Sequence, residues 1–282
     1  MAQTIAVLSQ KGGTGKTTAV RTLADAFRRR GVHTLAIDLD PQGNLSEYFN
    51  VLPGGGPTIA DVLCGRSHAT RAIRHDMIPA DLTLAEAELV LGGKMGRELA
   101  LRRALAEVTD DYELILIDCP PSLGLLTVNA LVAADQALVT AEAQYFALRG
   151  VDQAVEMVEL AREGLNPELS LLGVLLNLAD MRTVHSREAL ASLEVRFHEL
   201  VFGTVVRASI AYAESAKQAT SILDHRPDLG ADYLALASEV LERLEARGAS
   251  KRPVKLFFPS ASITAQATTP LAPAVGPLSA SP

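Results

Sequence analysis

Six runs of consecutive apolar residues are spread along the chain, and each run has the length of a β-strand. Their apolar side chains do not alternate with polar ones, which is typical of strands buried on both faces of a sheet. The runs cover residues 4–9, 32–38, 112–118, 136–141, 170–177 and 200–206. We therefore expect a sheet with no solvent-exposed face.

The segments between these runs have the spacing of amphipathic helices. Val20, Leu23, Ala24 and Phe27 lie at i, i+3, i+4 and i+7, and Gly31 predicts the end of that helix. Further helices are expected over residues 97–107, 150–163 and 187–199. Strands that alternate with helices predict an α/β fold, with a mostly parallel, twisted sheet and helices on both faces.

Composition divides the chain near residue 250. Residues 1–250 carry the strand and helix patterns and are expected to form one domain. Residues 251–282 contain six of the 14 prolines, and Ala, Ser and Thr make up much of the rest. This composition predicts a disordered tail.

Charge and cysteine content restrict the function classes. The net charge is −7, so any binding to nucleic acid has to come from a local cationic patch. Two cysteines, Cys64 and Cys119, give no disulfide framework and favour a reducing compartment. Neither a secretion signal nor an apolar run long enough to cross a bilayer is present, so we expect a cytoplasmic protein without a membrane partner.

A glycine-rich turn, KGGTGKTT at residues 11–18, joins the first strand to the first helix. Backbone N–H groups in such a turn bind phosphate oxygens, and the helix N-terminus behind it adds positive potential. Lys16 is expected to reach the β and γ phosphates of a nucleotide, and the Thr17 hydroxyl to bind Mg²⁺. Gln10 replaces the usual first glycine, which makes this the deviant form of the Walker A motif. The predicted phosphate-binding residues are Lys11, Gly12, Gly13, Thr14, Gly15, Lys16, Thr17 and Thr18.

Three aspartates follow the ends of predicted strands. Asp38 and Asp40 lie in the segment IDLDPQGNLS, and Asp118 ends LILID. Ligands of parallel sheets bind at the carboxyl ends of the strands, so we expect these carboxylates to converge on the bound phosphates. Asp118 is the Walker B carboxylate and is expected to reach Mg²⁺ through water.

These motifs resemble those of the ParA/Soj family of deviant Walker A partition ATPases. The resemblance runs from the first strand to about residue 247 and includes QKGGTGKTT, DLDPQGN, IDCPPSLGLLTVNAL and YFALRGVDQ. It implies the P-loop NTPase fold for residues 1–250, ATP and Mg²⁺ as cofactors, and ATP hydrolysis as the reaction. The lack of a leading helix-turn-helix segment implies the short form of the family.

The resemblance also implies roles for individual residues. Lys11 becomes the signature lysine, which contacts the phosphates of a second copy in a homodimer that encloses two ATP molecules. Asp40 would orient or deprotonate the attacking water, so the implied catalytic residues are Lys11, Lys16 and Asp40. The implied metal site consists of Thr17, Asp38, Asp40 and Asp118. Asn177 and Arg207 would flank the adenine base.

Family members bind DNA nonspecifically as ATP dimers, act with a ParB-like centromere-binding protein and associate with the nucleoid. The candidate DNA contacts in this chain are Arg187, Arg207, Lys217 and Arg226. For each of these cations, a plain surface ion pair is an equally good interpretation. The sequence departs from the family at two positions. Many relatives read I-P-R where this chain has Val205-Val206-Arg207, and Thr140-Ala141 stands where a proline is common.

Related proteins offer alternative functions. A MinD-like membrane positioner needs a terminal basic amphipathic helix, whereas here the last helix is followed by a Pro-rich segment. A nitrogenase-like iron protein needs cluster-ligating cysteines at positions that Cys64 and Cys119 do not match. A related tyrosine kinase would end in a tyrosine cluster, which this sequence lacks. A ParA-like positioner of a cargo other than a DNA locus remains open.

Overall fold

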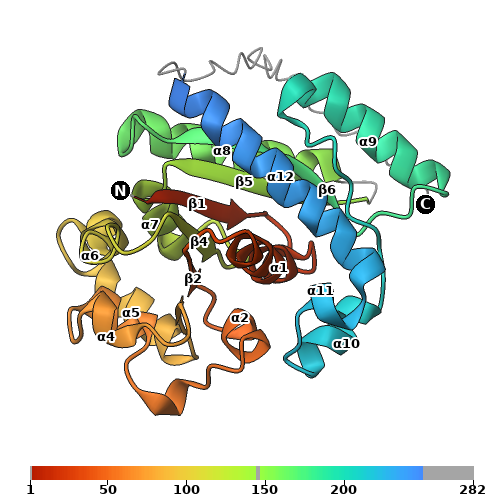
Figure 1. The fold of residues 1–282 in the computed structure, drawn as a ribbon. Helices are drawn as coiled ribbons and strands as arrows, with labels where there is room; N and C mark the ends of the chain where they lie inside the picture. Colours follow the sequence, from red (N-terminus) through yellow and green to blue (C-terminus); the bar gives the residue numbers. More distant parts are fainter. Residues whose placement is uncertain (1, 144–146, 250–282) are drawn as a thin grey trace, which may run out of the picture.

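A six-stranded parallel sheet forms the centre of the computed structural model, which describes residues 2–143 and 147–249 (Figure 1). The strand order is β3-β2-β4-β1-β5-β6, and every neighbouring pair is parallel. The strands are β1 (Gln3–Leu8), β2 (Thr34–Asp38), β3 (Met77–Ile78), β4 (Leu114–Asp118), β5 (Gln136–Glu142) and β6 (Ser170–Asn177). The predicted α/β fold with a parallel sheet is confirmed.

Helices cover both faces of the sheet. The α-helices are α1 (Lys16–Arg29), α2 (Asn44–Tyr48), α3 (Ile59–Cys64), α4 (Ala69–Ala72), α5 (Thr83–Gly92), α6 (Ala100–Leu105), α7 (Leu125–Ala133), α8 (Ala147–Gly164), α9 (Val184–Phe197), α10 (Ala211–Lys217), α11 (Ile222–His225) and α12 (Pro227–Ala249). Short 3₁₀ turns, η1 (Pro53–Gly55), η2 (Arg97–Leu99) and η3 (His198–Leu200), join some of them. Helices α1, α11 and α12 pack on one face, and α7, α8 and α9 on the other (Figure 1).

The two faces carry separate hydrophobic cores because successive strand side chains point in opposite directions. In β1, Ile5 and Val7 join the core under α1 and α12, whereas Ala6 and Leu8 join the core under α7 and α8. All four side chains are buried. This double burial explains the uninterrupted apolar runs of the sequence.

The sixth predicted strand, over residues 200–206, is wrong in part. This segment runs beside β6 and donates from Phe202 N to Val174 O at 2.9 Å and from Val206 N to Leu176 O at 3.2 Å. Between these two bonds, the N–H groups of Gly203 and Thr204 donate to the carboxylate of Glu239 in α12 instead. The ladder is interrupted there, so the segment forms only isolated bridges. The two-residue strand β3 was not predicted, because two apolar residues carry no periodic signal.

The sheet register brings the predicted aspartates together. β2 pairs with β4 so that Asp38 lies opposite Asp118, and Val7 of β1 lies on the other side of Asp118. The phosphate-loop turn follows β1 at this same edge. The predicted tail, residues 251–282, lies outside the described residues.

Candidate nucleotide-binding site

The glycine-rich turn between β1 and α1 has the backbone of a phosphate loop. Gly13 and Gly15 have φ values of 81° and 77°, a left-handed conformation that favours glycine. A Cβ on Gly15 would lie only 2.4 Å from Asn177 Nδ2, so the close approach of β6 also requires glycine there. Gly15 is therefore required for two independent reasons: its positive φ and the close approach of Asn177.

The first turn of α1 faces an anion site. Gly15 is the N-cap of α1, and the first helical bond runs from Ala19 N to Gly15 O at 2.9 Å. The N–H groups of Lys16, Thr17 and Thr18 precede that bond and have no intrahelical acceptor. With the helix dipole behind them, these donors suit a phosphate.

Lys16 is 6% exposed and lies against the turn. Its Nζ donates to Ser9 Oγ at 3.0 Å and to the Lys11 carbonyl oxygen at 3.4 Å. Burial lowers the pKa of Lys16, and the nearby carboxylates of Asp118 and Asp40 oppose that shift. Both hydrogen-bond acceptors of Lys16 are neutral oxygens, so a charged phosphate oxygen would be a stronger partner.

Thr17 and Asp118 form the other wall of the site. Thr17 Oγ1 donates to Asp118 Oδ2 at 2.7 Å, and the buried Oδ1 of Asp118 has no hydrogen-bond partner among the described residues. Burial first, and the neighbouring Asp38 second, raise the pKa of Asp118 to about 8. An unpartnered carboxylate oxygen beside a threonine hydroxyl fits a magnesium ion or its bound water, because Mg²⁺ prefers oxygen ligands.

Asp38 and Asp40 are held differently from each other. Asp38 is fully buried, and its Oδ2 accepts from both the backbone N–H and the hydroxyl of Ser46, at 2.9 and 2.7 Å. Burial raises its pKa to about 6, and the hydrogen bonds from Ser46 limit that shift. Asp40 accepts from Gln42 N at 3.0 Å and lines the cavity described next. Asp40 is thus the carboxylate with access to a ligand.

A cavity of about 600 Å³ opens in front of the phosphate loop. Its lining combines the loop with Asp40 and with a wall from α2 and α10. Beyond the predicted residues, it is lined by Gln42, Asn44, Glu47, Tyr48, Pro121, Leu178, Ser209, Tyr212, Ala213 and Ala216. A volume of this size lies within the range of about 300–1,000 Å³ that is usual for small-molecule sites. Within the described ranges, no three His, Cys, Asp or Glu side chains form a metal cage, so a cation here would depend on phosphate and water oxygens.

Lys11 lies outside this cavity. It is exposed and lines a second cavity of about 380 Å³, together with Gln10, Glu142 and Arg149. Thr14 connects the phosphate loop to β5. Its hydroxyl donates to Ser9 Oγ at 2.9 Å and lies 3.0 Å from Oγ1 of Thr140 in β5. The threonine that stands in place of the family's proline therefore contacts the phosphate loop itself.

The two residues expected at the base occupy different environments. Asn177 is fully buried, and its amide donates to the carbonyl oxygens of Thr14 and Gly15 at 2.9 and 3.2 Å, which ties β6 to the phosphate loop. Arg207 forms an ion pair with Asp232 at 2.8 Å and does not line the cavity. Their contact with a base stays a prediction.

The four candidate DNA contacts do not form one cluster. Arg207 and Arg226 lie together at the start of α12, because Arg207 Nη2 donates to Asp228 O and Arg226 pairs with the Asp228 carboxylate at 2.9 Å. Lys217 lines the nucleotide-side cavity. Arg187 donates to the carbonyl oxygens of Met181 and Arg182 at the start of α9, on the other side of α12 in Figure 1.

Several residues of the site carried little signal in the sequence. Thr140 contacts a residue 126 positions away, whereas Ser9 and Ser46 form hydrogen bonds to residues seven and eight positions away. Of these three residues, only Thr140 was marked in the sequence, as a departure from the family. Tyr48 and Tyr212 form aromatic parts of the cavity wall, one on α2 and one on α10. No pattern in a single sequence predicts that α2 and α10 line the same cavity.

The geometry defines a P-loop nucleotide-binding protein of the α/β class. Residues 2–171 match the family model described as an AAA domain. The chain is 35% identical to the chromosome-partitioning ATPase Soj of Treponema pallidum over 86% of its own length and 98% of that protein's. It is 39% identical to the chromosome-partitioning ATPase Soj of Thermus thermophilus, over 86% and 96%. The chain belongs to the ParA/Soj family of partition ATPases.

Solved structures agree with this fold. The crystal structure of a protein named cobyrinic acid a,c-diamide synthase, from Mycobacterium smegmatis with bound ADP and magnesium, is 34% identical with a TM-score of 0.75, covering 92% of this chain and 100% of that one. The Pyrococcus furiosus cell division ATPase MinD is 24% identical, with a TM-score of 0.71 over 86% of this chain and 99% of that one, a likeness of fold alone. In the part of the chain that the structure describes, no helix has the length and apolar content to span a membrane.

Proposed function

We propose that this protein hydrolyses ATP with Mg²⁺, dimerises around two ATP molecules, and binds DNA nonspecifically as that dimer. With a ParB-like partner it would then segregate a chromosome or plasmid, as a cytoplasmic protein associated with the nucleoid. The observation that carries the proposal is the meeting of Lys16, Thr17 and the unpartnered Oδ1 of Asp118 at one edge of the sheet. The named activity of the Soj relatives supports it.

Different residues of the chain have different roles in the proposed hydrolysis. The phosphate-loop N–H groups and Lys16 hold the β and γ phosphates and oppose the negative charge that develops during transfer. Asp40, at the wall of the cavity, orients the attacking water and accepts its proton. Thr17 would bind Mg²⁺, and Asp38, Asp40 and Asp118 would support the ion through its bound water. Bound with ATP, Mg²⁺ would neutralise charge on the β and γ phosphates.

The proposed dimer depends on Lys11. Its exposed position outside the cavity that holds Lys16 leaves it on a surface that a second copy can meet. A cation supplied from the partner subunit would complete each site only in the dimer, as arginine fingers do, with rate effects of about 10³–10⁵. ATP would then hold the two copies together, and hydrolysis would release them.

Phosphate release measured with ATP and Mg²⁺ tests the enzymatic part. Wild-type protein should release phosphate, Lys16→Ala should lose nucleotide binding, and Asp40→Ala should bind ATP but hydrolyse it at least about 100-fold more slowly. Arg71→Ala serves as a control because Arg71 is an exposed cation of α4 that lines neither cavity. Normal hydrolysis by Asp40→Ala would contradict the role of that carboxylate.

Base and DNA specificity need separate assays. Competition between ATP and GTP for the labelled nucleotide should favour ATP, since Asn177 and Arg207 are proposed to flank adenine. Gel shifts with ATP, with ADP and without nucleotide, over a salt series, should show binding mainly with ATP. Equal binding in all three states would contradict the proposal that ATP controls DNA binding. Sedimentation with liposomes, together with no binding to DNA, would favour a MinD-like role.

A further inference from the structure

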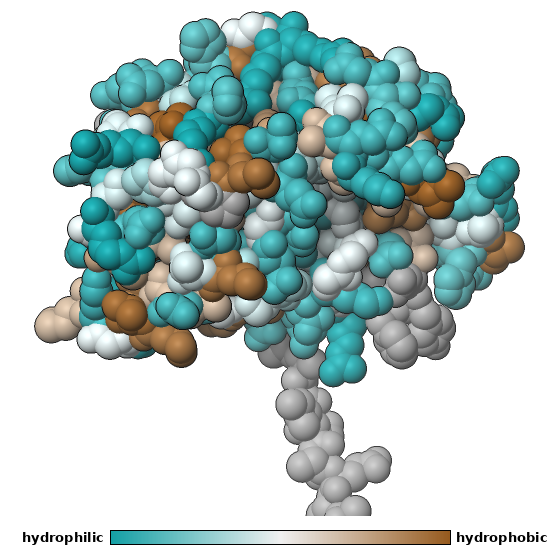
Figure 2. Space-filling model, turned by 90° about the horizontal axis from the view of Figure 1, so that it is seen from below, coloured by the Kyte–Doolittle hydropathy of each residue, from teal (hydrophilic) through white to brown (hydrophobic). Residues whose placement is uncertain are grey.

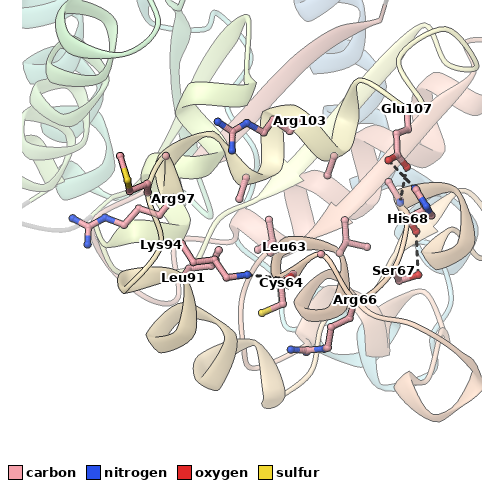
Figure 3. A pocket seen from close by; sticks show the side chains of 17 residues that line it. Leu63, Cys64, Arg66, Ser67, His68, Leu91, Lys94, Arg97, Arg103 and Glu107 are labelled. Atoms are coloured by element: carbon pink, nitrogen blue, oxygen red, sulfur yellow. Dashed lines mark hydrogen bonds and ion pairs between the residues drawn. The ribbon is translucent and has the colours of Figure 1, made fainter.

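A cleft remote from the phosphate loop has no role in the function proposed above. It has a volume of about 380 Å³ and lies between α3, the end of α5 and α6 (Figure 3). It shares no lining residue with the cavity that contains Lys16. Helices α5 and α6, which contribute to it, lie on the left of Figure 1, apart from α10 and α12.

The charge of this cleft is opposite to that of the protein as a whole. Four cationic side chains line it against one carboxylate, Glu107, in a chain of net charge −7. The cations are Arg66, Lys94, Arg97 and Arg103. Figure 3 shows them around the cleft, with the hydrogen-bonded pair of His68 and Glu107 at one end. An isolated patch of this kind raises the local concentration of anions.

Two of the four cations are already neutralised locally, and two are not. Arg66 pairs with Asp61 and Arg97 with Glu98, both at 2.9 Å. Lys94 Nζ donates to the carbonyl oxygen of Cys64 at 3.0 Å, which joins the end of α5 to the end of α3 without cancelling the charge. Among the described residues, the Arg103 guanidinium has neither an ion-pair partner nor a hydrogen-bond partner.

The Arg103 guanidinium lies close to the backbone of Gly96. A Cβ added to Gly96 would lie 3.0 Å from its Nη2, so the guanidinium rests on the Gly96 backbone. Gly96 has a φ of 65°, which favours glycine and keeps this surface open. Arg103 therefore lies at the cleft beside a position that favours glycine.

Apolar side chains form the remainder of the cleft. Leu63 and Leu91 are buried beneath it, whereas Met95 at its edge is 99% exposed. Next to it on α5, Leu89 and Val90 are 82% and 52% exposed. On the face seen in Figure 2, hydrophobic side chains form separate patches among hydrophilic ones. A ligand that matches this cleft carries both negative charge and an apolar group.

We propose that the cleft binds an acidic segment of a partner protein, with carboxylates at Lys94 and Arg103 and an apolar side chain over Leu63 and Leu91. Charge argues against one occupant from this chain itself. Residues 251–282 contain Lys251, Arg252 and Lys255 and no Asp or Glu. Duplex DNA has the right charge but offers no apolar side chain for the floor.

Selection from a phage-displayed library of short random peptides on the full-length wild-type protein tests this inference. Enriched peptides should contain Asp and Glu around a Leu, Ile, Met or Phe residue. The synthetic form of an enriched peptide should bind Arg103→Glu and Lys94→Glu at least about tenfold more weakly than wild type, since these variants reverse the attracting charge. Arg71→Glu, an exposed cation on α4 outside the cleft, carries the same charge change and should bind normally.

Three results would overturn the inference. The first is the enrichment of neutral or basic peptides, or of no peptides. The second is equal binding of an acidic peptide to wild type and Arg103→Glu. The third is a loss, in Arg103→Glu, of DNA binding or of self-association without nucleotide, which would assign the cleft to those partners. ATP hydrolysis of both cleft variants should equal that of wild type, so a failure here leaves the proposed ATPase function unaffected.

Discussion

At the scale of single residues, the most informative group is the carboxylate pair at the ends of β2 and β4. Asp38 and Asp118 face each other in register, both are buried, and burial is the main cause that raises both pKa values. Ser46 donates two hydrogen bonds to Asp38, but one oxygen of Asp118 has no partner among the described residues. The ligand-free site therefore carries an electrostatic cost that a bound cation would relieve.

That cost predicts a pH-dependent effect of Asp118→Asn on stability. The pKa of Asp118 is raised from 3.8 to about 8 in the folded state, so the unfolded chain loses this proton at lower pH than the folded one. The free energy of unfolding should therefore fall as pH rises from about 4 to 8, since the folded state binds the extra proton. Without nucleotide, Asp118→Asn should be more stable than wild type at pH 8 and close to it in stability at pH 4. Urea denaturation at both pH values measures this, and a difference independent of pH would be evidence against it.

At the scale of elements, the phosphate loop is held by the strand that ends beside it. Asn177 at the end of β6 binds two carbonyl oxygens of the turn, and Gly15 leaves room for its amide. This arrangement connects the shape of the loop to the packing of an element about 160 residues away in the sequence. The loop is consequently part of the sheet edge rather than an independent turn.

Gly15→Ala should therefore damage both stability and binding. The new Cβ would meet Asn177 Nδ2 at 2.4 Å, at a φ of 77° that side chains rarely adopt. We expect a destabilisation of about 1–3 kcal/mol and a loss of nucleotide affinity, measured by thermal unfolding and by nucleotide titration. Gly164→Ala is the matched control, because Gly164 ends α8 with nothing within 4 Å of an added Cβ. An unchanged melting temperature and affinity for Gly15→Ala would refute the steric argument.

The same scale shows what the sequence can and cannot predict. Uninterrupted apolar runs predicted five of the strands, and the position of the turn predicted that Lys16, Thr17 and Asp118 would meet. Residues 200–206 look like a strand, but Glu239 of α12 takes the N–H groups of Gly203 and Thr204, and no local pattern reports that competition. The contact of Thr140 with Thr14 was missed for the same reason, because it joins residues 126 positions apart. The hydrogen bonds of Ser9 and Ser46 are local, but no residue pattern marks them.

At the scale of the whole molecule, the proposed DNA binding of an acidic protein has to use a small, locally cationic part of its surface. Arg207 and Arg226 lie near each other at the start of α12. Arg207 forms a bidentate pair with the largely buried Asp232, whereas Arg226 forms an exposed pair with Asp228. An exposed pair contributes only about 0–1 kcal/mol, so a phosphate can compete for Arg226. Two such patches joined in one dimer would bind far more tightly than either alone.

Arg226→Ala should therefore weaken DNA binding without affecting hydrolysis. Each phosphate contact contributes about 0.9 to the slope of log affinity against log salt, so losing one contact in each of two subunits should reduce that slope by about 2. Titration of labelled duplex DNA with the ATP-bound protein over a salt series measures it, with Arg71→Ala as the control. An unchanged slope would remove Arg226 from the DNA surface.

The most direct test of the account is the mass of the protein in solution with a non-hydrolysable ATP analogue and Mg²⁺. Light scattering should give twice the 29.9 kDa mass of one chain for wild type with the analogue, and the mass of one chain without nucleotide. Lys11→Ala should bind the analogue and remain at the mass of one chain, since the lysine is proposed to act on the partner's phosphates. A wild-type protein that stays at 29.9 kDa when saturated with the analogue would contradict the nucleotide-enclosing dimer.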